Sequence, residues 1–145
     1  MVFLSAYQEF WNTKPEKKED LYEIKTTLLQ NGKKVQNLKS AEPVDLAVDI
    51  EAKKSGEYLM LEIPIPAGCS YRSKANYRRG YESHREYFKE KVAVFFEDLP
   101  KGTYQVSIQL EPRFEGSYTL NPTKMEQMYF PVFYGRNELE QVKIK

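Results

Sequence analysis

Residues 43–52 read Pro-Val-Asp-Leu-Ala-Val-Asp-Ile-Glu-Ala, and apolar side chains alternate with acidic ones along most of this stretch. Successive side chains of a β-strand point to opposite faces of its sheet, so the alternation predicts a strand buried on one side only. The side chains expected to point into the core are those of Val44, Leu46, Val48 and Ile50. The stretch therefore predicts a sheet with one packed and one solvated face.

The same pattern continues on the C-terminal side of this strand. Ser55-Gly56 is a turn signal and residues 57–63 follow as a second strand, so the two strands together predict a hairpin. A second such pair covers 92–96 and 104–110, joined at 99–102, where a proline presets the turn and a glycine supplies a positive φ. The inward side chains of its second strand are expected to be Tyr104, Val106, Ile108 and Leu110.

Further short strands are predicted on both sides of these pairs. Asn31-Gly32 is a strong two-residue hairpin signal between a strand over 21–29 and another over 33–38. Residues 117–120 and 141–144 add two more. Many short strands at turn spacings of about ten residues, with little helix, are typical of a β-sandwich, so we predict an all-β, antiparallel sandwich.

One short helical turn is predicted near residues 123–129. Thr123 and Glu126 have the spacing of a capping box, and Pro131 ends the turn. The helical spacing places Met125, Met128 and Tyr129 on one face. Met128 and Tyr129, with the Phe130-Pro131 that follows them, are either ordinary core under a loop or an exposed patch that binds a partner.

The N-terminal segment reads as separate from this domain. Residues 13–20 are charged and contain a proline, as linkers often do. We therefore predict that 1–12 are the tail strand of a preceding module, that 13–20 are a linker, and that the sandwich covers 21–145.

Composition excludes several classes of function. The chain has 145 residues, with 22 lysines and arginines against 21 aspartates and glutamates, so its net charge of +1 attracts neither nucleic acid nor anionic lipid at long range. One cysteine and one histidine argue against a disulfide framework and a structural metal. The chain has no nucleophile elbow or phosphate-binding glycine loop, and no apolar run long enough to enter a membrane. We expect no enzyme, no catalytic residues, no cofactor and no metal.

The stretch from Cys69 to Arg85 mixes aromatic and basic side chains. The tyrosines are Tyr71, Tyr77 and Tyr81, and the basic residues are Arg72, Lys74, Arg78, Arg79 and Arg85. The mixture has two interpretations: a platform that stacks on and attracts a ligand, or a surface loop whose tyrosines cover the sandwich edge while its arginines stay in water.

Several motifs in order along the chain resemble the C-terminal domain of bacterial alpha-2-macroglobulins, over residues 21–145. The most specific are a Pro-Ala-Gly strand end, a Leu-Pro-x-Gly-Thr-Tyr turn and a terminal Met-Tyr-x-Pro segment. They occur here within Ile65-Pro66-Ala67-Gly68, Leu99-Pro100-Lys101-Gly102-Thr103-Tyr104 and Met125-Glu126-Gln127-Met128-Tyr129-Phe130-Pro131, with His84-Arg85-Glu86 between them and Gly135-Arg136 after them.

The resemblance implies a macroglobulin-like sandwich, the last module of a large exported protease trap of the bacterial cell envelope, periplasmic or surface-exposed. Many members carry a Cys-x-Glu-Gln thioester in a separate domain; Cys69-Ser70-Tyr71-Arg72 does not match it, and some bacterial relatives lack it entirely. The implied role is non-catalytic: packing against the thioester domain and shielding it. The implied partners are other domains of the parent chain and, indirectly, a target protease. The expected partner-binding residues are Met125, Met128, Tyr129, Pro131 and Arg136.

A second hypothesis from the residues alone is a free-standing β-sandwich that binds carbohydrate or another surface through the Tyr71, Tyr77 and Tyr81 loop. Stabilisation by an added glycan would favour this hypothesis over an interdomain module.

Overall fold

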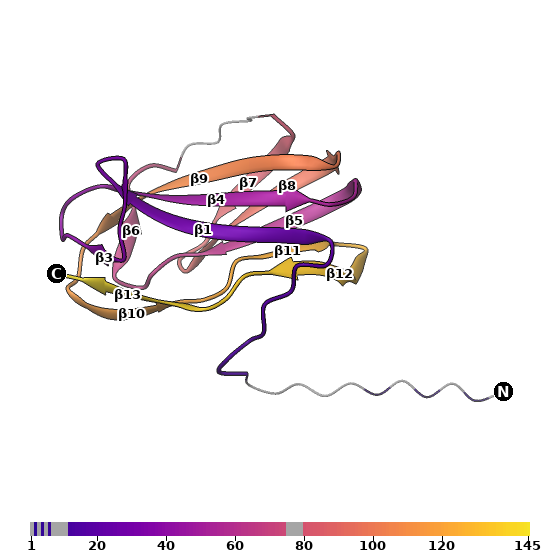
Figure 1. Cartoon of the computed structure of the whole chain (residues 1–145), viewed down its shortest axis with the longest axis horizontal. Helices are drawn as coiled ribbons and strands as arrows, with labels where there is room; N and C mark the ends of the chain where they lie inside the picture. Colours follow the sequence, from indigo (N-terminus) through magenta and orange to yellow (C-terminus); the bar gives the residue numbers. More distant parts are fainter. Residues whose placement is uncertain (1, 3, 5, 7–11, 75–79) are drawn as a thin grey trace.

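The computed structural model describes residues 2, 4, 6, 12–74 and 80–145, and all the regular elements in these residues are strands (Figure 1). One five-stranded sheet has the spatial order β2 (Lys33–Lys34), β1 (Tyr22–Gln30), β4 (Val44–Ala52), β9 (Gly102–Pro112) and β6 (Cys69–Tyr71). The other five-stranded sheet has the order β12 (Phe130–Arg136), β11 (Lys124–Gln127), β5 (Gly56–Pro64), β8 (Lys91–Leu99) and β7 (Glu82–Tyr87). A three-stranded sheet orders β10 (Gly116–Leu120), β13 (Glu140–Ile144) and β3 (Asn37–Leu38).

The two five-stranded sheets share one core, as an all-β sandwich requires. From the first sheet, the inward residues predicted on β4 and β9 are buried, except that Tyr104 is only partly buried at the edge. The second sheet contributes Leu59, Leu61, Ile63, Val92, Val94 and Phe96. Strand pairs are antiparallel in both large sheets, and β3 and β13 pair in parallel. The predicted fold class is confirmed.

The two hairpins predicted over 43–63 and 92–110 are wrong, because the two strands of each pair lie in different sheets. β4 pairs with β1 and β9, whereas β5 pairs with β11 and β8. In the same way β8 and β9 lie in different sheets. A turn signal shows where the chain reverses, but inward-facing residues at both ends of the turn suit a crossover between sheets as well as a hairpin.

The hairpin predicted at Asn31-Gly32 is present, but the strand after it is shorter than expected. Asn31 and Gly32 have φ of 52° and 73°, the left-handed pair that a tight hairpin needs. Only β2 then pairs with β1, and β3 pairs with β13 in another sheet. The predicted strand over 33–38 is therefore two short strands.

The helical turn predicted near 123–129 is wrong, because Lys124–Gln127 form strand β11 between β5 and β12. A strand with neighbours on both sides satisfies its backbone groups, whereas an isolated helical turn has a costly nucleus and leaves most of its groups unpaired. Thr123 caps no helix; its backbone N–H donates to Oδ1 of Asn137 at 2.6 Å. Residues 128 and 129 form the turn that joins β11 to β12.

Tyr22 joins the two large sheets at the end where β12 lies. A Cβ added at Gly135 would lie 2.2 Å from the backbone oxygen of Tyr22, so β12 approaches β1 as closely as only glycine allows. A Cβ at Gly56 would lie 2.9 Å from the Tyr22 hydroxyl, which also accepts a hydrogen bond from Nε2 of Gln127 at 3.2 Å. One buried residue, through its backbone and its hydroxyl, thus sets the positions of β5, β11 and β12.

Residues just before β1 lie against the sandwich. The backbone groups of Lys18 and Arg136 exchange two hydrogen bonds of 2.9 Å, and Nε of Arg136 donates to the carbonyl oxygen of Glu16 at 2.7 Å. The C-terminal half of the predicted linker is therefore attached to β12. Most of the tail strand predicted over 1–12 lies outside the described residues.

We predict that Gly135→Ala lowers the free energy of unfolding by about 1–3 kcal/mol. The added methyl group would clash with the backbone of Tyr22, which is fixed by the pairing of β1 with β4. Chemical denaturation of this variant and of Ser117→Ala, an exposed site on β10, provides the comparison. Equal midpoints for the two variants would contradict the close approach at Tyr22.

We predict that deleting residues 1–14 leaves a domain that unfolds in one cooperative transition, because the hydrogen bonds of Glu16 and Lys18 remain. Deleting residues 1–19 removes them and should lower the thermal midpoint. Loss of cooperative unfolding in the shorter deletion would show that the N-terminal segment belongs to this core.

Candidate functional site

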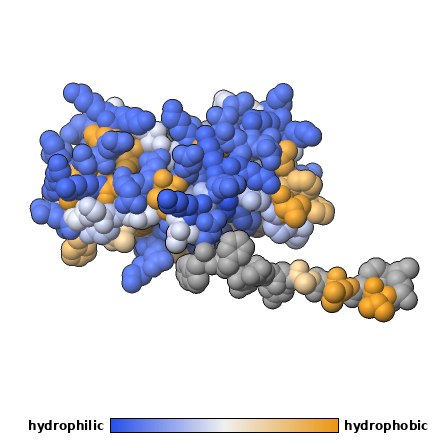
Figure 2. Space-filling view, turned by 60° about the horizontal axis from the view of Figure 1, so that its bottom comes forward, coloured by the Kyte–Doolittle hydropathy of each residue, from blue (hydrophilic) through white to orange (hydrophobic). Residues whose placement is uncertain are grey.

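The end of the β11–β12 hairpin carries a group of exposed apolar side chains. Tyr129 and Val132 are each 70% exposed and Phe130 is 62% exposed, which is unusual for large apolar residues. We call this surface the apolar tip; it consists of Tyr58, Met128, Tyr129, Phe130, Pro131, Val132 and Phe133. Figure 2 shows hydrophobic surface gathered at the end of the molecule where Figure 1 places β12.

The tip protrudes because the pairing of β11 with β12 is irregular. Glu126 pairs with Tyr134, but the next residue, Gln127, pairs with Phe130. Three residues of β12, 131–133, therefore have no opposite residue on β11. Such a bulge bends the strand away from its partner and exposes side chains that regular pairing would place on a sheet face.

The base of the tip is held at two points. The backbone N–H of Met128 donates to the carbonyl oxygen of Tyr58 at 2.9 Å, and the rings of Tyr58 and Tyr129 meet edge to face with centroids 5.2 Å apart. Gln127 donates to the buried Tyr22 hydroxyl. The tip is thus an exposed apolar surface on an ordered support.

The structure brings together three of the five predicted partner-binding residues. Met128, Tyr129 and Pro131 lie in the tip. Met125 does not: it is 0% exposed in the core, because on a strand it points to the opposite face from its neighbours, so its expected place on the same face as Met128 is corrected. Arg136 lies at the far end of β12 and holds the residues before β1.

Three residues of the tip were missed by sequence reasoning. Val132 and Phe133 belong to an unbroken apolar run with Tyr129 and Phe130, a signal that indicates a surface patch once the run is known to be a protruding strand. Tyr58 lies on β5, and nothing in the local sequence connects it to the β11–β12 turn.

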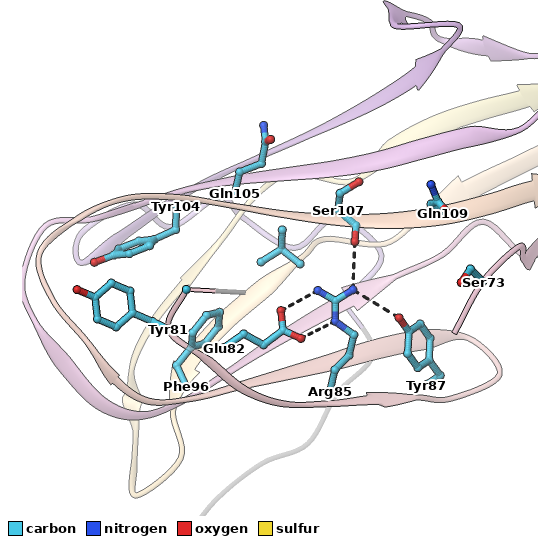
Figure 3. A pocket seen from close by; sticks show the side chains of 12 residues that line it. Ser73, Tyr81, Glu82, Arg85, Tyr87, Phe96, Tyr104, Gln105, Ser107 and Gln109 are labelled. Atoms are coloured by element: carbon cyan, nitrogen blue, oxygen red, sulfur yellow. Dashed lines mark hydrogen bonds and ion pairs between the residues drawn. The ribbon is translucent and has the colours of Figure 1, made fainter. Parts of the chain in front are cut away.

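A second candidate site lies at the opposite edge of the sandwich, where a cleft of about 510 Å³ separates β7 from β9 (Figure 3). Arg85 crosses it: Nε and Nη2 donate to the two carboxylate oxygens of Glu82, both at 2.7 Å, and Nη1 donates to the backbone oxygen of Ser107 at 3.1 Å. The side chains of Arg85 and Glu82 are only 11% and 5% exposed. Arg85 therefore ties two sheet edges together, which corrects the expectation that it stays in water.

The guanidinium group of Arg85 stays protonated in this ion pair. Burial by itself lowers the pKa of Arg85, but the hydrogen bonds to Glu82 and Tyr87 outweigh it, and the pKa is raised. Tyr81 packs edge-on against Tyr104 at the end of the cleft, with centroids 5.6 Å apart. The pair of charges is neutralised internally, so the cleft offers no net charge from it to an anionic ligand.

Tyr71 packs within the fold and is not free to stack on a ligand, as the carbohydrate hypothesis requires. The Tyr71 hydroxyl donates to the carbonyl oxygens of Phe88 and Lys91, at 2.5 and 2.9 Å, and its ring meets that of Tyr87 edge-on. Burial, with a smaller effect of Tyr87, raises the pKa of Tyr71 to about 12. Tyr77, Arg78 and Arg79 lie outside the described residues.

The lone cysteine and histidine have ordinary surroundings. Burial raises the pKa of Cys69 to about 12, so at neutral pH the side chain is the unreactive thiol. Nε2 of His84 lies 3.2 Å from a carboxylate oxygen of Glu86, and its ring stacks on Phe95. Residues 12–74 and 80–145, with the three described before them, contain no group of acidic, cysteine and histidine side chains that could hold a metal ion. Nor does that part of the chain form a helix able to cross a membrane.

Comparisons with known proteins agree with this architecture. Residues 11–131 match the family model of the bacterial alpha-2-macroglobulin MG10 domain. No curated protein matches the chain in sequence. Solved structures share its fold at low identity. A Salmonella alpha-2-macroglobulin variant matches 90% of this chain with a TM-score of 0.76 at 16% identity, and native Escherichia coli alpha-2-macroglobulin from domain MG7 to the C-terminus matches 89% with 0.74 at 15%.

A third structure, Escherichia coli alpha-2-macroglobulin activated by porcine elastase, matches 89% of this chain with a TM-score of 0.76 at 16% identity. The chain spans only 10%, 24% and 14% of these three structures, respectively. The family match covers most of the sandwich, including the motif segments 65–68, 99–104 and 125–131. This chain belongs to the bacterial alpha-2-macroglobulin MG10 domain family.

Proposed function

We propose that this domain is a non-catalytic module of a longer, protease-trapping bacterial alpha-2-macroglobulin and that its apolar tip packs against the thioester domain of the same chain. The observation that carries the proposal is the pair Met128 and Tyr129, exposed at a hairpin end whose base is fixed. In a parent that has a thioester, the tip would cover that bond until a protease triggers the trap.

The chemistry of a thioester explains why an apolar cover is useful. Water hydrolyses the bond, so it survives only where water is excluded. A thioether and an aromatic ring on a fixed turn fill a pocket with largely apolar surface and so exclude water from it. Met128 and Tyr129 meet this requirement.

The size of the tip also supports a partner. Seven neighbouring apolar or aromatic residues form a larger exposed patch than scattered surface apolar residues do, and such patches mark interaction sites. Since the chain spans a minor part of the structures it matches, another domain of the same parent is the nearest partner. A target protease would then be a partner only indirectly.

We place the parent in the bacterial cell envelope, periplasmic or exposed at the surface, as the family assignment suggests. Proteases that would attack envelope proteins are met there. The Escherichia coli protein of one matched structure was activated by elastase, and we propose that the parent of this domain also responds to a protease.

We predict that Met128→Ala or Tyr129→Ala, introduced into a thioester-containing parent, speeds loss of the thioester several-fold, measured as release of free thiol over time. The isolated domain should lose less than about 1.5 kcal/mol of stability, because both side chains are exposed and only the contact with Tyr58 is removed.

Phe114→Ala is the matched control, because Phe114 is also 70% exposed but lies in the loop before β10. It should leave the thioester lifetime unchanged. A loss of several kcal/mol of domain stability with an unchanged lifetime in the tip variants would instead identify Met128 and Tyr129 as structural residues only.

A further inference from the structure

Tyr58 has an unusual backbone conformation. Its φ is +51°, in the left-handed region that side chains other than glycine rarely adopt. Two other described non-glycine residues share a positive φ, Asn31 in a hairpin turn and Ala41 in a loop. Tyr58 is different, because it is a bulky residue within a strand, and such outliers often lie at functional sites.

The alternation of burial along β5 breaks just before this residue. Along β5, Glu57 and Tyr58 are exposed in succession, and burial then resumes with Leu59. Pairing with β8 passes from Glu57 with Asp98 to Leu59 with Phe96. The register with β8 is the same on both sides of Tyr58, so its ring lies on the outward face with Met60 and Glu62, and the break in burial falls at Gly56 and Glu57.

Both the carbonyl group and the ring of Tyr58 contact the turn that joins β11 to β12. The carbonyl oxygen of Tyr58 accepts the N–H of Met128, and its ring meets Tyr129 edge to face at 5.2 Å. The residue with the positive φ therefore contacts the turn twice, once through its backbone and once through its side chain.

We infer that Tyr58 is a positioning residue of the tip, and that its left-handed backbone and outward ring hold Met128 and Tyr129 in the orientation that the neighbouring domain receives. This inference rests on the proposed shielding function. Strain kept at a residue that holds the exposed turn by two contacts is explained if the turn must have one orientation.

The first test uses this chain alone. Glycine adopts a positive φ without strain but has no ring, so Tyr58→Gly should keep or raise the thermal midpoint while it loosens the turn. The usual strength of an edge-on aromatic pair predicts about a two- to tenfold loss of hydrogen-exchange protection at the Met128 amide. Backbone relaxation of residues 128–130 should show increased motion.

Two variants complete this test. Tyr58→Phe keeps the ring and should restore both protection and order. Tyr81→Gly removes a tyrosine of similar exposure, 50% against 47%, in an edge-on pair at the opposite edge, and should leave the Met128 amide unchanged. Unchanged protection at Met128 in Tyr58→Gly would overturn the inference, as would loss of the thermal midpoint and the tip order together in Tyr58→Phe.

The second test uses a thioester-containing parent and separates the two proposals. Tyr58→Gly should shorten the thioester half-life about two- to tenfold, and Tyr58→Phe should restore it. If Met128→Ala shortens the half-life and Tyr58→Gly does not, the positioning role is wrong and shielding stands. If neither Met128→Ala nor Tyr129→Ala changes it, shielding is wrong, and the inferred role in presenting the tip to a thioester domain fails with it, whatever the exchange data show about local order.

Discussion

The contact of Tyr22 with two glycines is the constraint on which the arrangement of the two large sheets depends. β1 belongs to one sheet, whereas β5, β11 and β12 belong to the other. The Tyr22 backbone excludes any side chain at Gly135, and its hydroxyl approaches Gly56 and bonds Gln127. A buried phenol must satisfy its hydroxyl, so this residue sets both a distance and a direction between the sheets. The turn that carries the tip follows directly from Gln127.

The two edge strands of the second sheet, β7 and β12, differ in whether other parts of the molecule cover them. At β7, Arg85 reaches the backbone oxygen of Ser107 across the cleft, and Tyr71 donates to two carbonyl groups of the β7–β8 turn. These contacts cover polar edge groups that would otherwise invite other strands. At β12, the hairpin end instead presents apolar side chains to solvent. The molecule closes one edge and leaves the other available, which agrees with the proposed role as a module of a longer chain.

Alternation in the sequence identified the inward faces of β4 and β9 because it depends only on the period of a strand. It did not identify partners, since β4 and β5 are equally well explained by a hairpin or by a crossover. The site was predicted in part: Met128, Tyr129 and Pro131 were found from a local motif, while Tyr58 comes from a strand 70 residues earlier and could be found only in three dimensions. Met125 was misplaced because the period of the segment was taken as helical.

The failures of local rules are concentrated around the tip. A capping-box sequence forms strand β11, a tyrosine takes a backbone conformation suited to glycine, and phenylalanine and valine are left in water on a bulged strand. Elsewhere in the two sheets, the alternation of side chains agrees with their burial, although the turn signals did not identify the strand partners. Natural sequences are consistent across these levels except where function requires otherwise. Three conflicts at one hairpin end support the proposal that the hairpin meets a partner, and the strain at Tyr58 supports the inference that it does so in one orientation.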